Sequence, residues 1–460
     1  MYTTEKLARF ILAIDKEKIP EASFQAAVKC VLDVFGATSA GFEAATPTRE
    51  FAMAVYSDHV VTTDAVCDNS GGEAAVLLAG RRCNMIGAAF ANSAAASALD
   101  LDDGHRAAMG HPGAAVIPAA ISVSEKIRVE IHDFLIAVIL GYEIGVRIAK
   151  SRDHAGLSTL STGRWSAYAV VACAGRLMGL TETHLAQALS VAGVLSPELS
   201  AAGYSAVMGN AAKEGIPWSV VTGLSACLMA RNGFTGPLDI LDNPDYFDAA
   251  GIMEDIDDVN PLPAYAIETV YFKPYACCRW IHAAIDAVLA MNIPDPEGIT
   301  SIIVNTFERA LRLSNETSPV TLEGAQYSLP FCIAAAAIKG RNVFAPMDVE
   351  LLKDVAVLNL AKKVTLIADP EMSRLFPSQT PSKVRITTTH GQFEKTIDYP
   401  FGDPKNPMSF DDVAQKFLKL AAETPIQQKA VINFIKRLHD EKDARHASIK
   451  ELTHLFSCFF

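Results

Sequence analysis

The chain has 460 residues, half of them hydrophobic and 20% charged, and carries a formal net charge of −12. This length exceeds what one hydrophobic core usually supports, so we expect two domains. The composition is that of a globular protein and not of a disordered one. The acidic balance argues against nucleic acid as the main partner, because phosphate binding requires a basic surface.

The first 21 residues predict an amphipathic helix with Leu7, Phe10 and Ile11 on its apolar face, and no signal-peptide core follows it. The most apolar run, residues 134–149, contains Glu143 and Arg147 and is too short to span a bilayer. Their i, i+4 spacing predicts a helical ion pair. Nine cysteines without regular spacing and without a CxxC motif suit a reducing compartment. We therefore expect a cytosolic protein without a membrane partner, structural zinc or an iron–sulfur cluster.

Up to about residue 260 the sequence predicts one helix after another, with strand signals scarce. Alanine and glycine are frequent in these helices, which allows them to pack closely in an all-α domain. We expect helices over residues 24–42, 88–99, 114–124, 133–149, 166–178, 182–191 and 211–229.

Near residue 265 the pattern changes, because two prolines interrupt it and Ile267, Val270 and Phe272 form a β-branched and aromatic run. Beyond this boundary we expect helices and strands to alternate. The expected elements are helices over 280–291 and 327–339, strands over 299–307 and 362–369, and a hairpin over 383–400.

After Pro407, Ser409 caps a further amphipathic helix with Asp412 three residues on. We therefore predict a mainly α fold with a smaller α/β domain. Residues 1–265 form the all-helical domain and are joined by C-terminal helices within 405–460, while residues 266–404 form the α/β domain.

The stretch ALDLDDGHRAAMGHPG, residues 98–113, gathers Asp100, Asp103, His105 and His111 between apolar helices. Its spacing does not match an EF-hand, whose twelfth residue is a glutamate and not a histidine, and we predict no metal here. One interpretation is a solvated loop whose acids cap the next helix. The other is a cleft in which an aspartate raises the basicity of His105 or His111 and makes it a general acid/base.

Two further stretches carry charged or polar groups next to expected helix starts. Lys273, Arg279 and His282 could hold a carboxylate, or the two cations could simply solvate a surface turn. The neighbouring Cys277 and Cys278 fit packing better than nucleophilic catalysis. Around residues 203–215, Tyr204 and Lys213 precede an expected helix, whose entry at Gly209 and Asn210 is either an anion-binding end or a cap.

Several segments, in this order, resemble the MmgE/PrpD family of dehydratases, decarboxylases and epimerases. They are AAFANSAAASALDLDDGH, GHPGAAVIPAA, GNAAKEG, KPYACCRWIHAAID, YSLPFCIAAAAIKG and DYPFGDPKNPMSFDDVAQKF. The resemblance implies an all-α domain with a smaller α/β domain, a homodimer, and an active site between the domains. It also implies cofactor-independent chemistry on small di- or tricarboxylates, in which a bond breaks at a carbon next to a carboxylate.

Position by position, the family pattern matches at Asp100, His111 and Lys273 and departs elsewhere. The family's threonine after the paired acids is Gly104 here, and a family lysine falls on Tyr204. A family histidine falls on Cys278, near which His282 could compensate. The His-Pro-Thr element of the family falls on residues 157–159, which read Leu, Ser and Thr.

We therefore expect a lyase or isomerase that acts on a small polycarboxylate by proton abstraction next to a carboxylate. Dehydration of a 2-methylcitrate-type acid is the narrowest version, and decarboxylation of a cis-aconitate-type acid and epimerisation are the alternatives. A binding protein or an unrelated rearrangement is the alternative of another class. The catalytic candidates are His111, Asp100, Asp103, His105, Tyr204 and Lys273. The substrate-binding candidates are Arg279, Tyr142, Cys278, His282 and Lys213.

Overall fold

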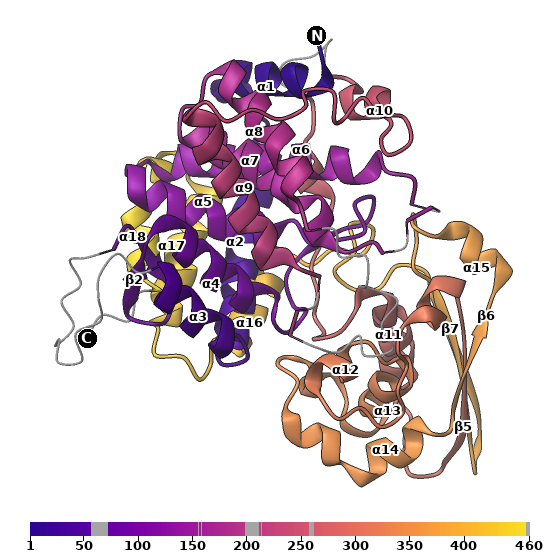
Figure 1. The fold of residues 1–460 in the computed structure, drawn as a ribbon. Helices are drawn as coiled ribbons and strands as arrows, with labels where there is room; N and C mark the ends of the chain where they lie inside the picture. The colour runs from indigo at the N-terminus through magenta and orange to yellow at the C-terminus, as the bar shows by residue number, and fades with distance from the viewer. Residues whose placement is uncertain are drawn as a thin grey trace.

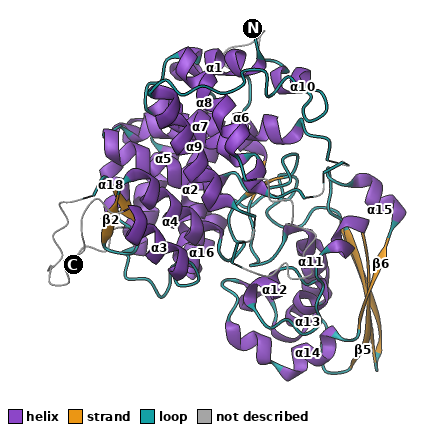
Figure 2. Ribbon diagram, viewed as in Figure 1, coloured by secondary structure: helices purple, strands orange, loops and turns teal. Residues whose placement is uncertain are grey.

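The computed structural model describes residues 1–56, 72–154, 156–157, 159–197, 211–212, 214–256 and 262–456. A large helical body and a smaller part with a β-sheet lie next to each other, and the C-terminal segment returns to the helical body (Figure 1). Figure 2 shows that helix dominates the larger part and that the long strands belong to the smaller one. This confirms the predicted mainly α fold with a smaller α/β part.

The helical body begins with the predicted amphipathic helix, in which Leu7, Phe10 and Ile11 are buried. The N-terminal helices are α1 (Thr3–Ala13), α2 (Glu21–Gly41), α3 (Thr46–Tyr56), α4 (Met85–Ser97), α5 (Gly113–Ile127), α6 (Ile131–Lys150), α7 (Ser166–Leu177), α8 (Glu182–Leu195), α9 (Ile216–Arg231) and α10 (Ala249–Met253). Short strands β1 (Ala74–Val76) and β2 (Arg81–Cys83) pair before α4. Each helix predicted for this body is present. Its ends differ from the predicted ends by a few residues, because capping residues and turns determine where a helix begins and ends.

The C-terminal helices complete the larger hydrophobic core. They are α16 (Phe410–Leu420), α17 (Gln428–Asp440) and α18 (Ile449–His454), and they pack on α2 and α5. Ser409 caps α16 in a capping box with Asp412, as predicted. Val413 and Phe417 of α16 are buried in the same core as α1 and α2. Residues about 400 positions apart in the sequence therefore lie side by side.

The smaller part is a four-stranded sheet with helices packed on it. Its strands are β5 (Ile299–Thr306), β6 (Val364–Ala368), β7 (Ser382–Thr388) and β8 (Gly391–Ile397), in the order β6-β5-β7-β8. Strand β5 runs parallel to β6 and antiparallel to β7, and β7 and β8 form the predicted hairpin. The helices are α11 (His282–Met291), α12 (Leu322–Gln326), α13 (Leu329–Lys339), α14 (Val355–Ala361) and α15 (Pro370–Leu375).

One side of this sheet is covered. Alternate residues of β7, such as Val384 and Ile386, are buried, and α11 contacts β7 and β8 while α13 contacts β6. The helices therefore pack on the buried face of the sheet.

The run at Ile267, Val270 and Phe272 is not a strand of this sheet. A 3-10 helix occupies Ala266–Thr269, and only β4 (Val270–Tyr271) is extended. Strand β4 pairs antiparallel with β3 (Gly104–His105), so Gly104 lies opposite Tyr271. The β-branched and aromatic run thus contributes only a two-residue strand, which pairs outside the four-stranded sheet. Its apolar side chains belong to the core of the helical body, and its backbone pairs with the acidic stretch.

The predicted ion pair of Glu143 and Arg147 forms within α6. Within the part of the chain that the structure describes, no helix is both long enough and apolar enough to cross a membrane.

Candidate functional site

The stretch between α4 and α5 is a buried, irregular turn. Asp100 has a φ of 55°, in the left-handed region that aspartate tolerates better than most residues. At the other end, a Cβ atom on Gly113 would overlap the Asp103 carboxylate and the Tyr142 hydroxyl, so only glycine fits at the start of α5. The turn thus directs several polar side chains inward.

Burial decides between the two interpretations of this stretch. The exposed fractions are 6% for Asp100, 1% for Asp102, 0% for Asp103 and 8% for His111. A solvated loop is therefore wrong, because these acids face the protein interior. Buried charges require partners.

The His111 imidazole lies among carboxylates. Its Nδ1 lies 2.9 Å from the Asp103 carbonyl oxygen, which can only accept a hydrogen bond, so Nδ1 carries a proton. The other nitrogen, Nε2, lies 3.6 Å from Asp100 Oδ1 and 3.9 Å from Glu214 Oε1. Asp102 Oδ2 lies 3.5 Å from Nδ1. Nε2 is therefore the atom that can exchange a proton with a ligand.

The charges around His111 favour its protonated form. Burial by itself lowers the pKa of His111, and so does the nearby Lys273 ammonium. The carboxylates of Asp102, Glu214 and Asp100 outweigh both and raise the pKa of His111 above its ordinary value. These charges therefore favour the imidazolium form of His111, which is a proton donor.

Lys273 supplies a second cation to the same group of residues. Its side chain is completely buried and its Nζ lies 2.6 Å from Asp100 Oδ1. Burial lowers the pKa of Lys273, but Asp100 and Asp102 raise it further, so the lysine stays charged. The alternative in which Lys273 solvates a surface turn is wrong. We call Asp100, Asp102, His111, Glu214 and Lys273 the His111 cluster.

Asp100, Asp102 and His111 also offer ligand atoms within 4.8 Å of one another, close enough to hold a metal ion. The Lys273 ammonium already neutralises Asp100, and a divalent cation would be repelled by it. We therefore interpret the three residues as a site for proton transfer.

Asp103 does not point at His111 with its carboxylate. Its Oδ2 accepts a 2.6 Å hydrogen bond from the Tyr142 hydroxyl, and its Oδ1 accepts one from the Gly113 amide. Burial and the nearby Asp33 and Asp102 raise the pKa of Asp103 to about 7, against the hydrogen bond from Tyr142. Asp103 supports His111 through its backbone carbonyl, and Tyr142 is engaged with Asp103.

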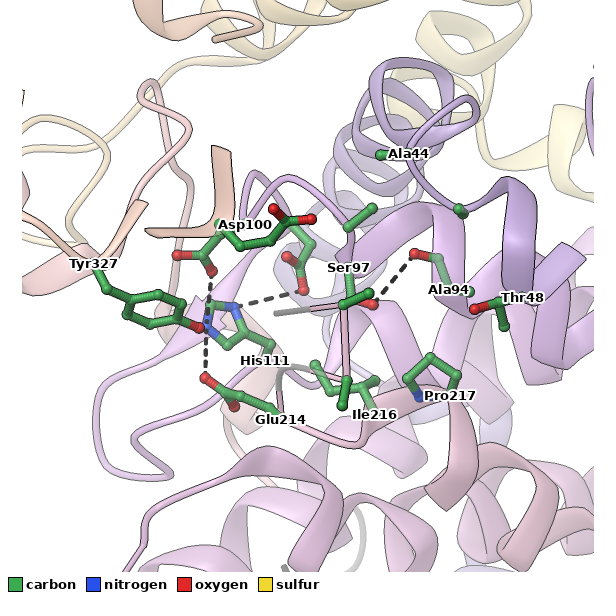
Figure 3. A pocket seen from close by; sticks show the side chains of 16 residues that line it. Ala44, Thr48, Ala94, Ser97, Asp100, His111, Glu214, Ile216, Pro217 and Tyr327 are labelled. Carbon is green, nitrogen blue, oxygen red and sulfur yellow. Dashed lines mark hydrogen bonds and ion pairs between the residues drawn. The ribbon is translucent and has the colours of Figure 1, made fainter. Parts of the chain in front are cut away.

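A cavity of about 50 Å³ lies beside the cluster (Figure 3). Asp100, Asp102, His111 and Glu214 are among the residues that line it. Tyr327, which precedes α13 of the smaller part, also lines it and projects toward His111. The remaining lining is mostly apolar and comes from α3, α4, α9 and the segments beside them in the helical body, and from α12 in the smaller part. It comprises Ala44, Ala45, Thr48, Ala94, Ser97, Ala98, Ala211, Ala212, Ile216, Pro217 and Glu323. The cavity therefore lies between the helical body and the smaller part.

His105 lies outside the His111 cluster, although it is only six residues away from His111. Its Nε2 is 2.9 Å from the Thr269 hydroxyl, and its Nδ1 accepts from the Ala108 amide. Burial and the charges of Lys150 and Arg106 lower the pKa of His105 to about 4. The structure therefore does not show the raised basicity expected for His105, which stays neutral near pH 7.

This buried neutral histidine predicts a loss of stability in mild acid. Between pH 6.5 and 4 the unfolded chain binds a proton at His105 that the folded chain does not, so the free energy of unfolding falls as pH falls. The contribution amounts to about 3 kcal/mol over this window. We expect the free energy of unfolding of His105→Gln, measured in urea, to fall less between pH 7 and pH 4 than that of the parent chain. Equal slopes for variant and parent would contradict the assignment.

Arg279 and His282 are buried but engaged with protein groups. Arg279 donates to the carbonyl oxygens of Pro400 and Phe401, and its Nη1 lies 3.2 Å from His282 Nδ1. His282 Nε2 lies 3.1 Å from the Cys277 carbonyl oxygen. Burial and the charges of Arg279 and Lys273 hold the pKa of His282 well below its ordinary value. These contacts engage both Nη atoms of Arg279 and both ring nitrogens of His282. Because Arg279 is only 4% exposed, the alternative of a surface turn is wrong.

Two other candidates, Tyr204 and Lys213, lie outside the described residues. Cys278 is near the His111 cluster, since Asp100 and Glu214 contribute to its pKa and Lys273 opposes them. Burial is the main cause and raises the pKa of Cys278 to about 12, so the thiol stays protonated. This agrees with the interpretation of Cys278 as a packing residue and not a nucleophile.

Sequence reasoning missed Asp102, Glu214 and Tyr327. Glu214 is held by Thr162, whose amide and hydroxyl both donate to its Oε2, and the Thr162 hydroxyl also accepts from the His111 amide. Glu214 and Tyr327 both lie in segments that resemble the family, but nothing in their spacing relates them to His111. Asp102 lies in the acidic stretch next to Asp103. The sequence pattern of that stretch does not tell which of the two side chains points toward His111.

Two family models match the chain. The MmgE/PrpD N-terminal domain matches residues 5–255 and the MmgE/PrpD C-terminal domain matches residues 275–441. Among curated proteins, a cis-aconitate decarboxylase of Aspergillus terreus is 25% identical over 389 residues, covering 76% of this chain and 77% of that protein. A cis-aconitate decarboxylase-like protein of Aspergillus oryzae is 25% identical over 459 residues, covering 91% and 90%.

These matches support the expectation of an enzyme of the lyase or isomerase class. The family models together span far more than half of the sequence, and they follow each other in the order in which the helical body and the sheet follow each other. The chain belongs to the MmgE/PrpD family.

Proposed function

We propose that this chain is a lyase that acts on a small polycarboxylate, with His111 as its proton-transfer group. The observation that carries the proposal is the position of His111, whose Nε2 faces the cavity while Asp100, Asp102 and Glu214 favour its charged form. Lys273 places a second positive charge beside it. His111 lines a partly apolar cavity, and Lys273 places its charge on Asp100, which lines the same cavity, so the site suits an anionic substrate.

Decarboxylation of a cis-aconitate-type acid is the first candidate reaction. The bond between a carbon and its carboxylate breaks, carbon dioxide leaves, and the electron pair remains on the carbon, delocalised into the conjugated acid. The His111 imidazolium then donates its Nε2 proton to that carbon. The neutral imidazole recovers a proton from solvent. The raised pKa of His111 suits this reaction, which needs an acid, and the named decarboxylases among its relatives favour it.

Dehydration of a 2-methylcitrate-type β-hydroxy acid is the second candidate. It requires a base that takes a C–H proton as well as an acid that protonates the departing hydroxide. The position of the Glu214 carboxylate favours dehydration, because it lies 3.9 Å from His111 Nε2. One of the two groups would act as the base and the other as the acid. Tyr327, which projects toward His111, would provide a further proton donor, whereas the Tyr142 hydroxyl is bonded to Asp103.

The test is to incubate the purified chain with cis-aconitate and, separately, with 2-methylcitrate in heavy water. Decarboxylation is expected to release carbon dioxide and to place one deuterium on the carbon that lost it, which NMR detects. Loss of water from 2-methylcitrate without carbon dioxide would establish the second candidate. Binding of acids without turnover or exchange would overturn the lyase and establish the alternative of a binding protein.

Homodimerisation, a cytosolic location and independence of cofactors belong to the same proposal. They rest on the family resemblance and on the cysteine pattern. Size-exclusion chromatography with light scattering tests the first of them, and activity after treatment with a chelator tests the last.

A further inference from the structure

Tyr271 fills a space that a side chain at residue 104 would otherwise occupy. Strands β3 and β4 pair so that Gly104 lies directly opposite Tyr271. A Cβ atom on Gly104 would overlap both the hydroxyl oxygen and the Cζ atom of Tyr271. The phenol therefore reaches across to the strand that follows Asp103, and only glycine permits this approach.

The surroundings of the Tyr271 hydroxyl are those of a binding group. The side chain is 6% exposed, and its hydroxyl makes no hydrogen bond to any residue that the structure describes. By contrast, the buried hydroxyls of Tyr142 and Tyr275 donate to Asp103 and Asp286. The Tyr271 oxygen is not among the fully enclosed polar atoms that lack a partner, as the Tyr265 hydroxyl is, so it is accessible and free to donate to an external oxygen.

Tyr271 also lies close to the His111 cluster. The charges of Asp100 and Glu214 act on its hydroxyl, and the Arg279 guanidinium stacks on its ring 4.7 Å from the centroid. Burial is the main cause that raises the pKa of Tyr271, and the Arg279 charge opposes it. The hydroxyl therefore stays protonated and can donate a hydrogen bond but does not become an anion. Lys273 follows two residues later and reaches Asp100.

We propose that the Tyr271 hydroxyl donates a hydrogen bond to a carboxylate oxygen of the substrate, and that the pair Gly104 and Tyr271 sets the substrate specificity of this chain. This inference rests on the proposed function, because it takes the ligand to be a polycarboxylate held beside Lys273 and His111. The Tyr271 hydroxyl lies where a side chain at residue 104 would lie, and the ring that carries it comes from the opposite strand.

The first test compares the binding of cis-aconitate and tricarballylate to the parent chain and to Tyr271→Phe by calorimetry. Loss of a hydrogen bond to a charged group is expected to weaken binding of the preferred acid at least about tenfold. The matched control is Tyr168→Phe, which removes a buried phenol hydroxyl in α7 and is expected to leave binding unchanged. Binding by Tyr271→Phe within twofold of the parent would overturn the inference.

The second test uses the contact with Gly104. Gly104→Ala must displace the Tyr271 ring, so it is expected to weaken binding as Tyr271→Phe does. In a Tyr271→Ala background the added methyl group meets open space and is expected to cost no further affinity. Additive losses would overturn the inference. Failure of the parent chain to bind either acid would overturn the proposed function and this inference together, whereas equal binding by parent and variants overturns the inference alone.

Discussion

Turnover by a His111→Gln variant is expected to fall by about 10² to 10⁴-fold, because general acid/base groups contribute that much to catalysed rates. His111 Nδ1 donates to the Asp103 carbonyl, so only Nε2 exchanges a proton with the substrate. Glutamine has a similar length and can keep one hydrogen bond, but its amide does not titrate. The measurement is the steady-state rate of conversion of the preferred polycarboxylate, with circular dichroism to show that the fold persists.

The pH profile separates a chemical role of His111 from a structural one. The imidazolium is present below its raised pKa and is lost as pH rises through it, so the rate should fall on the alkaline side. Glu214→Gln removes one of the charges that raise the pKa of His111. The loss of rate on the alkaline side should therefore begin at lower pH in this variant. His184→Gln, in α8, is the control and should leave rate and profile unchanged. Full turnover by His111→Gln would contradict the proposed role.

Substitution of Lys416 by methionine is expected to lower the free energy of unfolding by about 3–5 kcal/mol, the cost of leaving a buried charge without its partner. Lys416 lies on α16 and is 7% exposed, with its Nζ 2.6 Å from Asp33 Oδ1 on α2. The same Nζ donates to the carbonyl of Leu101, which lies between Asp100 and Asp102. The measurement is equilibrium unfolding in urea.

Two comparisons test this assignment. Lys419→Met, on the same helix, removes a lysine whose Nζ donates to the exposed Asn342 side chain, and it should change the free energy by less than about 0.5 kcal/mol. The double variant Asp33→Leu with Lys416→Met should recover most of the loss, because it removes both charges. A single Lys416→Met variant as stable as the parent would show that the pair contributes nothing.

The helices were predictable because their apolar periodicity is local. α6 begins and ends within two residues of the prediction, and the Glu143–Arg147 pair lies at the spacing that helix geometry dictates. The same reasoning could not assign a partner to the run at Ile267, Val270 and Phe272. Their β-branched and aromatic character favours extended structure but does not determine which strand becomes the partner, and the partner is Gly104–His105.

Part of the candidate site was also predictable. Asp100, His111 and Lys273 were chosen from charged groups within apolar surroundings and from the family pattern, and the structure brings them together. His105 was an equally reasonable choice by composition, yet its position on β3 turns it toward Thr269. Arg279 was chosen for its charge, but backbone carbonyls accept hydrogen bonds from both of its Nη atoms.

The sequence by itself determined the helical body, the alternation that makes the sheet, and the stretches that hold titratable groups, because these follow from residue periodicity and from the cost of burying charge. Only the tertiary structure decided which of the groups meet. The left-handed turn at Asp100 directs neighbouring acids in different directions, Glu214 and Tyr327 come from distant segments, and Tyr271 takes the place of a side chain at residue 104. Contacts of this kind depend on the path of the whole chain, which spacing along the sequence does not encode.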